Sequence, residues 1–198
     1  MDVTSFFVYC FIVTFTPGPT NIVILSTVHN LGTKKAMEYA WGAILAIGIL
    51  LAASTILNSM LVFVIPKILS IMQIIGSLYM LYLAYQISKM EAISTATTQT
   101  AGFISGALMQ FVNPKVVLFT MTVMPSFVMP YYKTPFALAL FVAAITVIAF
   151  LALITWVLFG TICKEFLQKY HKTVNIILAL FLVYSAIVVS GLVELLRG

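Results

Sequence analysis

Charged residues are scarce in this sequence, and acidic residues are the scarcest. Asp, Glu, Lys and Arg together form 8% of the 198 residues, with five acidic side chains against ten basic ones. Soluble domains carry about 25% charged residues, which give a folded chain its polar surface. Hydrophobic residues form 63% of this chain instead. This composition excludes an ordinary soluble domain and predicts a chain whose solvent is lipid.

Cysteine is also scarce, and no cluster of metal-ligating residues is apparent in the sequence. Cys10 and Cys163 are far apart and belong to no Cys-x-x-Cys pair. Each lies among apolar residues, a setting typical of small buried side chains. No candidate catalytic triad is present. We therefore expect the protein not to be an enzyme, with no catalytic residue, no cofactor and no metal site.

Long apolar runs dominate the rest of the sequence. A membrane span must satisfy its own backbone, either as a helix or in a closed barrel. A barrel would alternate apolar and polar residues over short segments, whereas these runs reach the length of about 20 residues that a spanning helix needs. The predicted spans are about 4–28, 36–64, 69–88, 102–128, 135–162 and 174–196. The sequence therefore predicts an all-α integral membrane protein with six transmembrane helices in a single domain, residues 1–198.

The loops between these spans predict the orientation in the membrane. A tight turn is expected at 65–67, and the longest loop at 89–101. The loops after the first, third and fifth spans hold Lys34, Lys35, Lys89, Lys164, Lys169 and Lys172, whereas the other side holds Lys67, Lys133 and Arg197. Loops rich in basic residues face the cytoplasm. Both termini are therefore predicted outside the cytoplasm. Because the basic residues are scattered at span ends, no nucleic-acid partner is expected.

Prolines interrupt the first and fourth predicted spans. Proline removes a backbone donor and clashes with the preceding helical turn. The run from Thr16 through Pro17 and Gly18 to Pro19 should break the first helix. We expect Thr16 to cap a second half-helix, with Pro17 in its first position. Asn113 and Pro114 are expected to do the same in the fourth span.

The two breaks also suggest an internal repeat. Thr16-Pro17 lies 97 positions before Asn113-Pro114, and Phe6 lies 97 positions before Phe103. The halves, about 1–92 and 100–198, would each hold three helices, and an odd number places the second half upside down in the membrane. Inverted repeats of this kind are typical of secondary transporters. Chance alignment of two prolines is the alternative.

The broken helices define a candidate binding site. Freed backbone groups are costly in lipid unless they face protein or a wet cavity, so both breaks should point inward. The start of a half-helix carries partial positive charge and suits an anionic group such as a carboxylate. An isolated lysine deep in a span, here Lys115, is a functional candidate by default. The candidate substrate-binding residues are Thr16, Pro17, Gly18, Pro19, Asn21, Asn113, Pro114 and Lys115. The alternatives are packing kinks and a lysine that extends to the membrane surface.

Other polar and small residues receive weaker predictions. Asn58, Gln73 and Gln110 either line the site or form bonds between helices. No acidic residue lies deep in a predicted span, and His29 and Glu38 are expected on the solvated surface. Small residues allow close helix packing, and they leave room for a homodimer. The predicted packing glycines are Gly42, Gly48, Gly102 and Gly106.

These motifs resemble the LysE/RhtB family of amino-acid exporters. The run 16–19 is similar to the family's proline-glycine-proline signature, and Asn113-Pro114-Lys115 with 124–128 is similar to its second signature. The segment 76–85 resembles its usual third-helix ending. The resemblance implies a six-helix carrier in the bacterial inner membrane, driven by the membrane gradient, that exports amino acids or their derivatives. Its transport core would include Pro17, Gly18, Pro19, Asn113, Pro114 and Lys115.

The chain departs from this family in one respect, and other functions remain as alternatives. Many members carry an acidic residue in the second helix, near 47–49, where this chain has none. A membrane thiol-redox carrier would need Cys10 and Cys163 close together. A membrane subunit that transports nothing would need a larger surface for a partner than these short loops offer. The expected partners are therefore a small-molecule substrate and the lipid bilayer.

Overall fold

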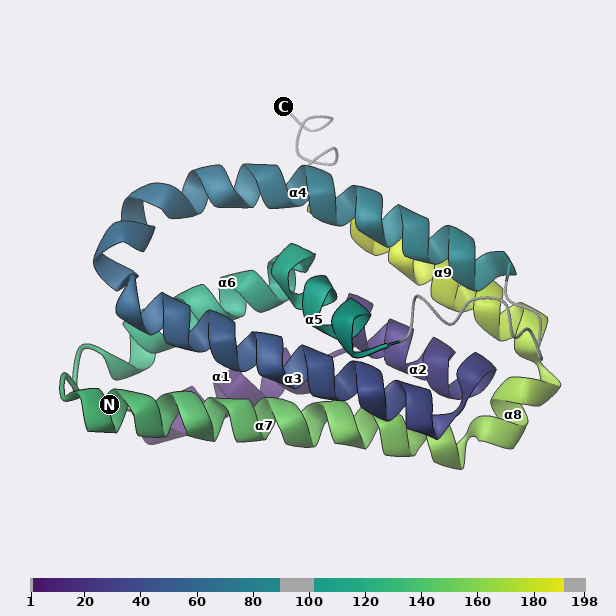
Figure 1. Ribbon diagram of the computed structural model, residues 1–198, viewed down its shortest axis with the longest axis horizontal. Helices are drawn as coiled ribbons and strands as arrows, with labels where there is room; N and C mark the ends of the chain where they lie inside the picture. The colour runs from purple at the N-terminus through teal and green to yellow at the C-terminus, as the bar shows by residue number, and fades with distance from the viewer. Residues whose placement is uncertain (1, 90–101, 191–198) are drawn as a thin grey trace.

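The computed structural model describes residues 2–89 and 102–190, and this part of the chain contains helices and no strands (Figure 1). The all-α prediction is therefore confirmed for the described residues. The predicted loop at 89–101 lies almost wholly outside them, as do Arg197 and the end of the sixth predicted span. The helices are α1 Val3–Phe15, α2 Pro19–Leu31, α3 Thr33–Ile56, α4 Asn58–Lys89, α5 Phe103–Val112, α6 Pro114–Val123, the π-helical η1 Met124–Val128, α7 Pro135–Ile162, α8 Lys164–Lys169 and α9 His171–Val189.

Two of the predicted spans are bent at the prolines, as expected. The pair formed by α1 and α2 is bent by 45° from a straight helix. The pair formed by α5 and the segment of α6 and η1 is bent by 69°. Helices α3 and α7 are each long and apolar enough to cross a membrane, and each bent pair is long enough as a unit. The described residues thus contain two to four candidate spans by length and composition. Helix α9 adds a shorter apolar helix.

The predicted turn at 65–67 is wrong. Helix α3 ends at Ile56, the N–H of Leu57 donates to the carbonyl of Ala53, and α4 then continues through Pro66 to Lys89. One proline removes one backbone hydrogen bond from a helix of 32 residues. The apolar residues on both sides favour a helix, because a turn would expose several backbone groups to lipid. The second predicted span is therefore shorter, and the third longer, than the sequence indicated.

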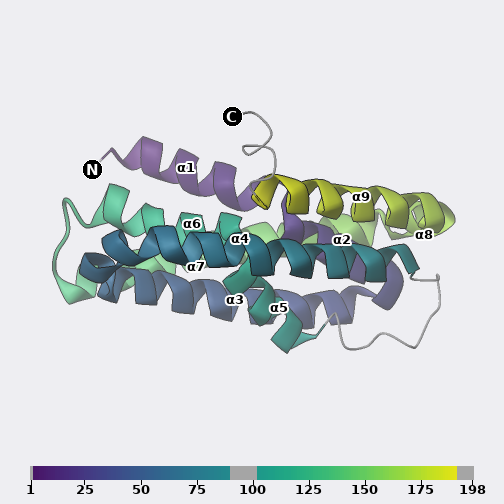
Figure 2. The same cartoon turned by 90° about the horizontal axis from the view of Figure 1, so that it is seen from above.

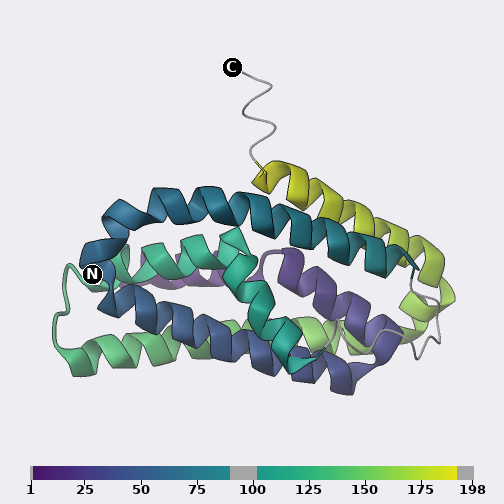
Figure 3. The same ribbon diagram turned by 45° about the horizontal axis from the view of Figure 1, so that its top comes forward.

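The helices alternate in direction along the long axis of the molecule. In Figures 1 and 2, α1 and α6 lie toward one end, and α2 and α5 toward the other, so the two bent pairs run in opposite directions. Figure 3 shows the same relation for α4 and α9, which pack side by side. Helices α3 and α7 also run oppositely. A bent pair, a long helix and another helix therefore occur in this order twice along the chain.

Helix α2 is enclosed by other helices. It packs against α3, α7, α8 and α9, and nearly all of its side chains are buried. The outer faces of the other helices carry large exposed apolar side chains, such as Phe136 and Ile162, which are 81% and 82% exposed. An apolar exterior around a centre that contains polar residues is typical of a membrane protein. This arrangement confirms a membrane-embedded fold.

Two glycines allow one close helix crossing. A Cβ on Gly42 would lie 1.8 Å from the carbonyl oxygen of Phe103, and one on Gly106 would lie 2.0 Å from that of Tyr39. Helices α3 and α5 therefore touch through their backbones, as the packing prediction requires. A Cβ on Gly48 would make only ordinary contact with Thr146, and one on Gly102 would have none of the described residues within 4 Å. The packing role predicted for Gly102 is thus wrong.

Candidate functional site

The second half-helix of the first bent pair starts two residues later than predicted. Helix α1 ends before Thr16, whose backbone is extended ahead of Pro17 and whose hydroxyl donates to the carbonyl of Ile12 at 2.6 Å. Gly18 is the residue that precedes α2, and Pro19 occupies its first position. The prediction that Thr16 and Pro17 start the second half-helix is therefore wrong. The cause is in the local sequence. Each proline favours extended backbone in the residue before it, so Thr16 and Gly18 are both extended and the second helix begins only at Pro19.

The second break has the predicted cap. Asn113 precedes α6, and its side-chain oxygen accepts a hydrogen bond from the backbone N–H of Lys115 at 3.1 Å. Pro114 occupies the first helical position, where its missing N–H costs nothing. The matched starts of α2 and α6 are therefore Pro19 and Pro114, separated by 95 residues instead of the predicted 97.

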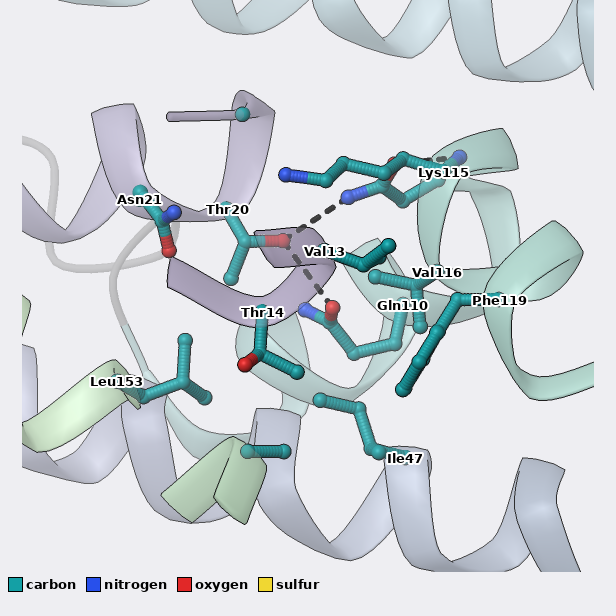
Figure 4. Close-up of a pocket in the computed structure, with 13 residues that line it drawn as sticks. Val13, Thr14, Thr20, Asn21, Ile47, Gln110, Lys115, Val116, Phe119 and Leu153 are labelled. Atoms are coloured by element: carbon teal, nitrogen blue, oxygen red, sulfur yellow. Dashed lines mark hydrogen bonds between the residues drawn. The ribbon is translucent and has the colours of Figure 1, made fainter. Parts of the chain in front are cut away.

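Thr20 joins the two breaks. Its hydroxyl donates to the side-chain oxygen of Gln110 at 3.1 Å and accepts from the side-chain nitrogen of Asn113 at 3.0 Å. The nitrogen of Gln110 in turn donates to the carbonyl of Gly106 at 2.9 Å. Figure 4 shows Thr20 and Gln110 facing each other from α2 and α5. Thr20 and the two side chains that it connects are each at least 95% buried, so this network fixes the crossing point of the bent pairs.

Lys115 reaches from the second break to the first. Its ammonium donates to the carbonyl oxygen of Thr16 at 2.8 Å and to the Thr16 hydroxyl at 3.0 Å. Its side chain lies against Gly18, where a Cβ would be 3.3 Å from both Cδ and Nζ of the lysine. Among the side chains that the structure describes, the only ion pair joins Lys35 and Glu38. The ammonium of Lys115 is therefore bound by neutral oxygens, and it has no carboxylate partner among the described side chains.

Two hollows meet at Lys115. An inner cavity of about 50 Å³ lies between α1, α2, α3, α5, α6 and α7, and its polar lining includes Thr14, Thr20, Asn21 and Gln110 (Figure 4). A wider groove of about 250 Å³ lies between the breaks and α9. Gly18, Asn113 and Lys115 line both hollows. The inner cavity has room for water and not for an amino acid, so a solute can enter only if the helices around it move.

The structure brings together every candidate residue predicted from the sequence, and Thr16 and Pro17 differ from their predicted roles. Asn21 donates from its side-chain nitrogen to the Thr16 carbonyl at 2.9 Å, and Pro17 and Pro114 line the groove. Thr20 was missed, because a threonine in the first turn of a helix has no distinctive sequence signal. Gln110, named among the weaker candidates, lines the cavity. The side chains of Asn58 and Gln73 lie outside the described residues.

His29 departs from its prediction. It was expected on the solvated surface, but it is 2% exposed, and neither ring nitrogen has a hydrogen-bond partner in the structure. Helices α3, α7, α8 and α9 pack around α2 and cover it. Glu38 lies at the surface as expected, where it pairs with Lys35 at 2.7 Å.

The fold and the site define a helical membrane protein with a central site at two interrupted helices. The LysE type translocator family matches residues 11–190 of this chain. Similar curated proteins are the cysteine/O-acetylserine efflux proteins of Klebsiella pneumoniae, 30% identical over 93% of this chain and 95% of that protein, and of Salmonella typhimurium, 29% identical over 94% and 96%. No solved structure matches. The chain belongs to the LysE type translocator family; it is a membrane transport protein and not an enzyme.

Proposed function

We propose that this protein is a secondary transporter of the bacterial inner membrane that exports a small amino acid or amino-acid derivative of the cysteine and O-acetylserine class. The observation that carries the proposal is the meeting of two broken helices around Lys115, beside a mainly apolar cavity that a few polar side chains reach. The efflux function named for the similar proteins supports the direction of transport and the kind of solute.

The site suits a solute with a carboxylate. Lys115 offers an ammonium without an acidic partner among the described side chains, and the start of α6 lies beside it. Both the charge of Lys115 and the partial positive charge of the helix start favour an anionic group. The inner cavity adds neutral polar groups and little space, which favours small side chains over large ones. We therefore assign the carboxylate of the solute to Lys115.

We further propose six spans arranged as two inverted three-helix repeats. The opposite directions of the two bent pairs, and of α3 and α7, support this arrangement (Figure 1). The ends of α2, α4 and α7 and the starts of α3 and α9 lie at one end of the molecule, where the sequence places Lys34, Lys35, Lys89 and Lys172. By the positive-inside rule this end faces the cytoplasm, with the N-terminus on the other side.

The thiol-redox alternative finds no support in the structure. Cys10 is buried in α1, whereas Cys163 follows the last residue of α7, and both are free. Helix α1 lies toward one end of the molecule and the end of α7 at the other (Figure 1). The two sulfur atoms therefore cannot form a working pair without a rearrangement of the fold.

The test is efflux from intact cells. Cells with and without the protein are loaded with labelled cysteine, O-acetylserine and a panel of other amino acids, and the rate of release is measured. We expect faster release of the small neutral compounds, and loss of that release in Lys115→Gln. The control is Lys133→Gln, because Lys133 is exposed in the loop before α7 and its removal strengthens the positive-inside bias. Equal release with and without the protein would rule out this solute class.

A further inference from the structure

The end of α1 already binds an ammonium group. The Nζ atom of Lys115 lies 2.8 Å from the Thr16 carbonyl and 3.0 Å from the Thr16 hydroxyl. The last carbonyls of a helix have no partner in the helix and carry partial negative charge. A cation is therefore stabilised at this position. In this structure the chain fills its own cation site with a side chain that comes from the other broken helix.

The carbonyl oxygen of Thr16 has no capacity for a further donor. The carbonyl accepts from the side-chain nitrogen of Asn21 at 2.9 Å as well as from Lys115, and a carbonyl oxygen has two lone pairs. The hydroxyl donates its proton to Ile12, so toward Lys115 it acts as an acceptor. Another ammonium can bind to the Thr16 carbonyl only if Asn21 or Lys115 leaves it.

Lys115 is the donor that can leave. Asn21 is 4% exposed and held within the buried helix α2. Lys115 is half-buried, has a long flexible stem and lines both the inner cavity and the outer groove. A solute in the groove therefore meets the lysine directly. An α-amino acid brings a carboxylate, which attracts the lysine, and an ammonium, which can replace it.

We propose that the carbonyl and hydroxyl of Thr16 form the subsite for the α-ammonium group of the exported solute, and that Lys115 occupies this subsite until the solute's carboxylate draws its ammonium away. The inference rests on the proposed function and adds to it a second recognised group. Recognition then requires a free amine beside the carboxylate. A compound without the carboxylate does not draw Lys115 away from Thr16. A compound without the ammonium cannot replace Lys115 at Thr16.

A pair of isomers tests the requirement for the amine. Purified protein is placed in vesicles loaded with labelled O-acetylserine or N-acetylserine, which have the same atoms and the same carboxylate but differ in the free ammonium. We expect transport of O-acetylserine alone. Equal transport of both isomers would overturn the Thr16 subsite and leave the export function in place. Transport of neither would overturn the proposed function together with the subsite.

A second measurement separates the subsite from a structural role of Lys115. The probe is labelled O-acetylethanolamine, which has the ammonium but no carboxylate, and its equilibrium binding to purified protein is measured. Lys115→Met removes the competing ammonium, so we expect about tenfold tighter binding than in the wild type, the effect of about one charge-assisted hydrogen bond. Lys133→Met is the matched control and should bind as the wild type does.

The double variant Thr16→Val, Lys115→Met completes the test. Valine keeps the backbone carbonyl but removes the hydroxyl, so part of the gain should disappear. Binding to Lys115→Met that is equal to or weaker than wild-type binding would overturn the proposal. A misfolded variant cannot imitate the expected result, because that result is a gain of binding.

Discussion

Thr20 joins the two broken helices through one hydroxyl group. It accepts from Asn113 and donates to Gln110, so each side of the crossing depends on the same oxygen atom. A buried polar group without a partner costs about 1–3 kcal/mol. Within a membrane the measured gain per hydrogen bond is smaller, about 0.6 kcal/mol on average, because the unfolded chain also finds partners. Loss of the Thr20 hydroxyl should therefore lower the free energy of unfolding only modestly, while it slows efflux clearly.

We expect Thr20→Val to lower the free energy of unfolding by about 1–2 kcal/mol, since Gln110 and Asn113 each lose a buried partner. Valine has nearly the same shape, so packing is preserved. Thermal unfolding in detergent and the rate of efflux are the measurements. The control is Thr155→Val, because Thr155 is exposed on α7 and its hydroxyl bonds only to the carbonyl of Leu151 in its own helix. A Thr20→Val protein with unchanged efflux would show that the network is not part of the transport path.

Gly18→Ala tests the space around Lys115. The backbone of Gly18 is extended, with φ −160°, so alanine fits the conformation. Its Cβ would lie 3.3 Å from Cδ and Nζ of Lys115, and the flexible lysine must shift. We expect near wild-type unfolding temperature but slower efflux, because the added methyl group hinders the movement by which Lys115 leaves the Thr16 oxygens. Unchanged efflux would mean that the position of Lys115 tolerates displacement.

At the scale of helices, the crossing of α3 and α5 is the closest contact that the glycines reveal. Neither Gly42 nor Gly106 has room for a Cβ, and the obstructing atoms are backbone carbonyl oxygens, which cannot rotate away. The crossing holds α5 against α3 on the side of α5 next to Gln110. Small residues at such contacts are the usual means by which helices associate in lipid.

We expect Gly42→Ala and Gly106→Ala to destabilise the protein by at least about 1–3 kcal/mol, the usual cost of overpacking. The two helices must separate to make room, which also displaces Gln110 from Thr20. The yield of folded protein and its unfolding temperature measure the effect. Gly102→Ala is the matched control, because a Cβ on Gly102 would have none of the described residues within 4 Å and Gly102 precedes the same helix. Equal stability of all three variants would contradict the close crossing.

The sequence predicted the helices better than their boundaries and contacts. Both broken spans were predictable, because proline cannot continue a helix. The cap of α2 was misplaced by two residues, because Thr16 and Gly18 are both acceptable before a proline. The prediction of a turn at 65–67 was also wrong. A proline in the sequence shows that one backbone hydrogen bond is lost, but it does not show whether the helix continues through it. Neither the role of Thr20 nor the burial of His29 could be predicted, because both depend on which helices lie opposite.

For the whole molecule, orientation in the membrane is the property that the charges predict. A chain without Cys10 and Cys163, each replaced by alanine, allows single cysteines to be introduced at Lys34 and Lys133. We expect a membrane-impermeant thiol reagent to label Lys133→Cys in intact cells, and Lys34→Cys only after the cells are opened. The physical reason is the cluster of basic residues at the end of the molecule that holds the start of α3. The reverse pattern would invert the proposed topology.

The shared hydroxyl of Thr20 also limits the order of events in a transport cycle. Neither bent pair can straighten or tilt by itself without losing a hydrogen bond to the other, because Thr20 belongs to α2 while Gln110 and Asn113 flank the second break. The two bent pairs should therefore move at the same step of the transport cycle. Opening at one face of the membrane should coincide with closure at the other, which keeps a continuous leak through the protein rare.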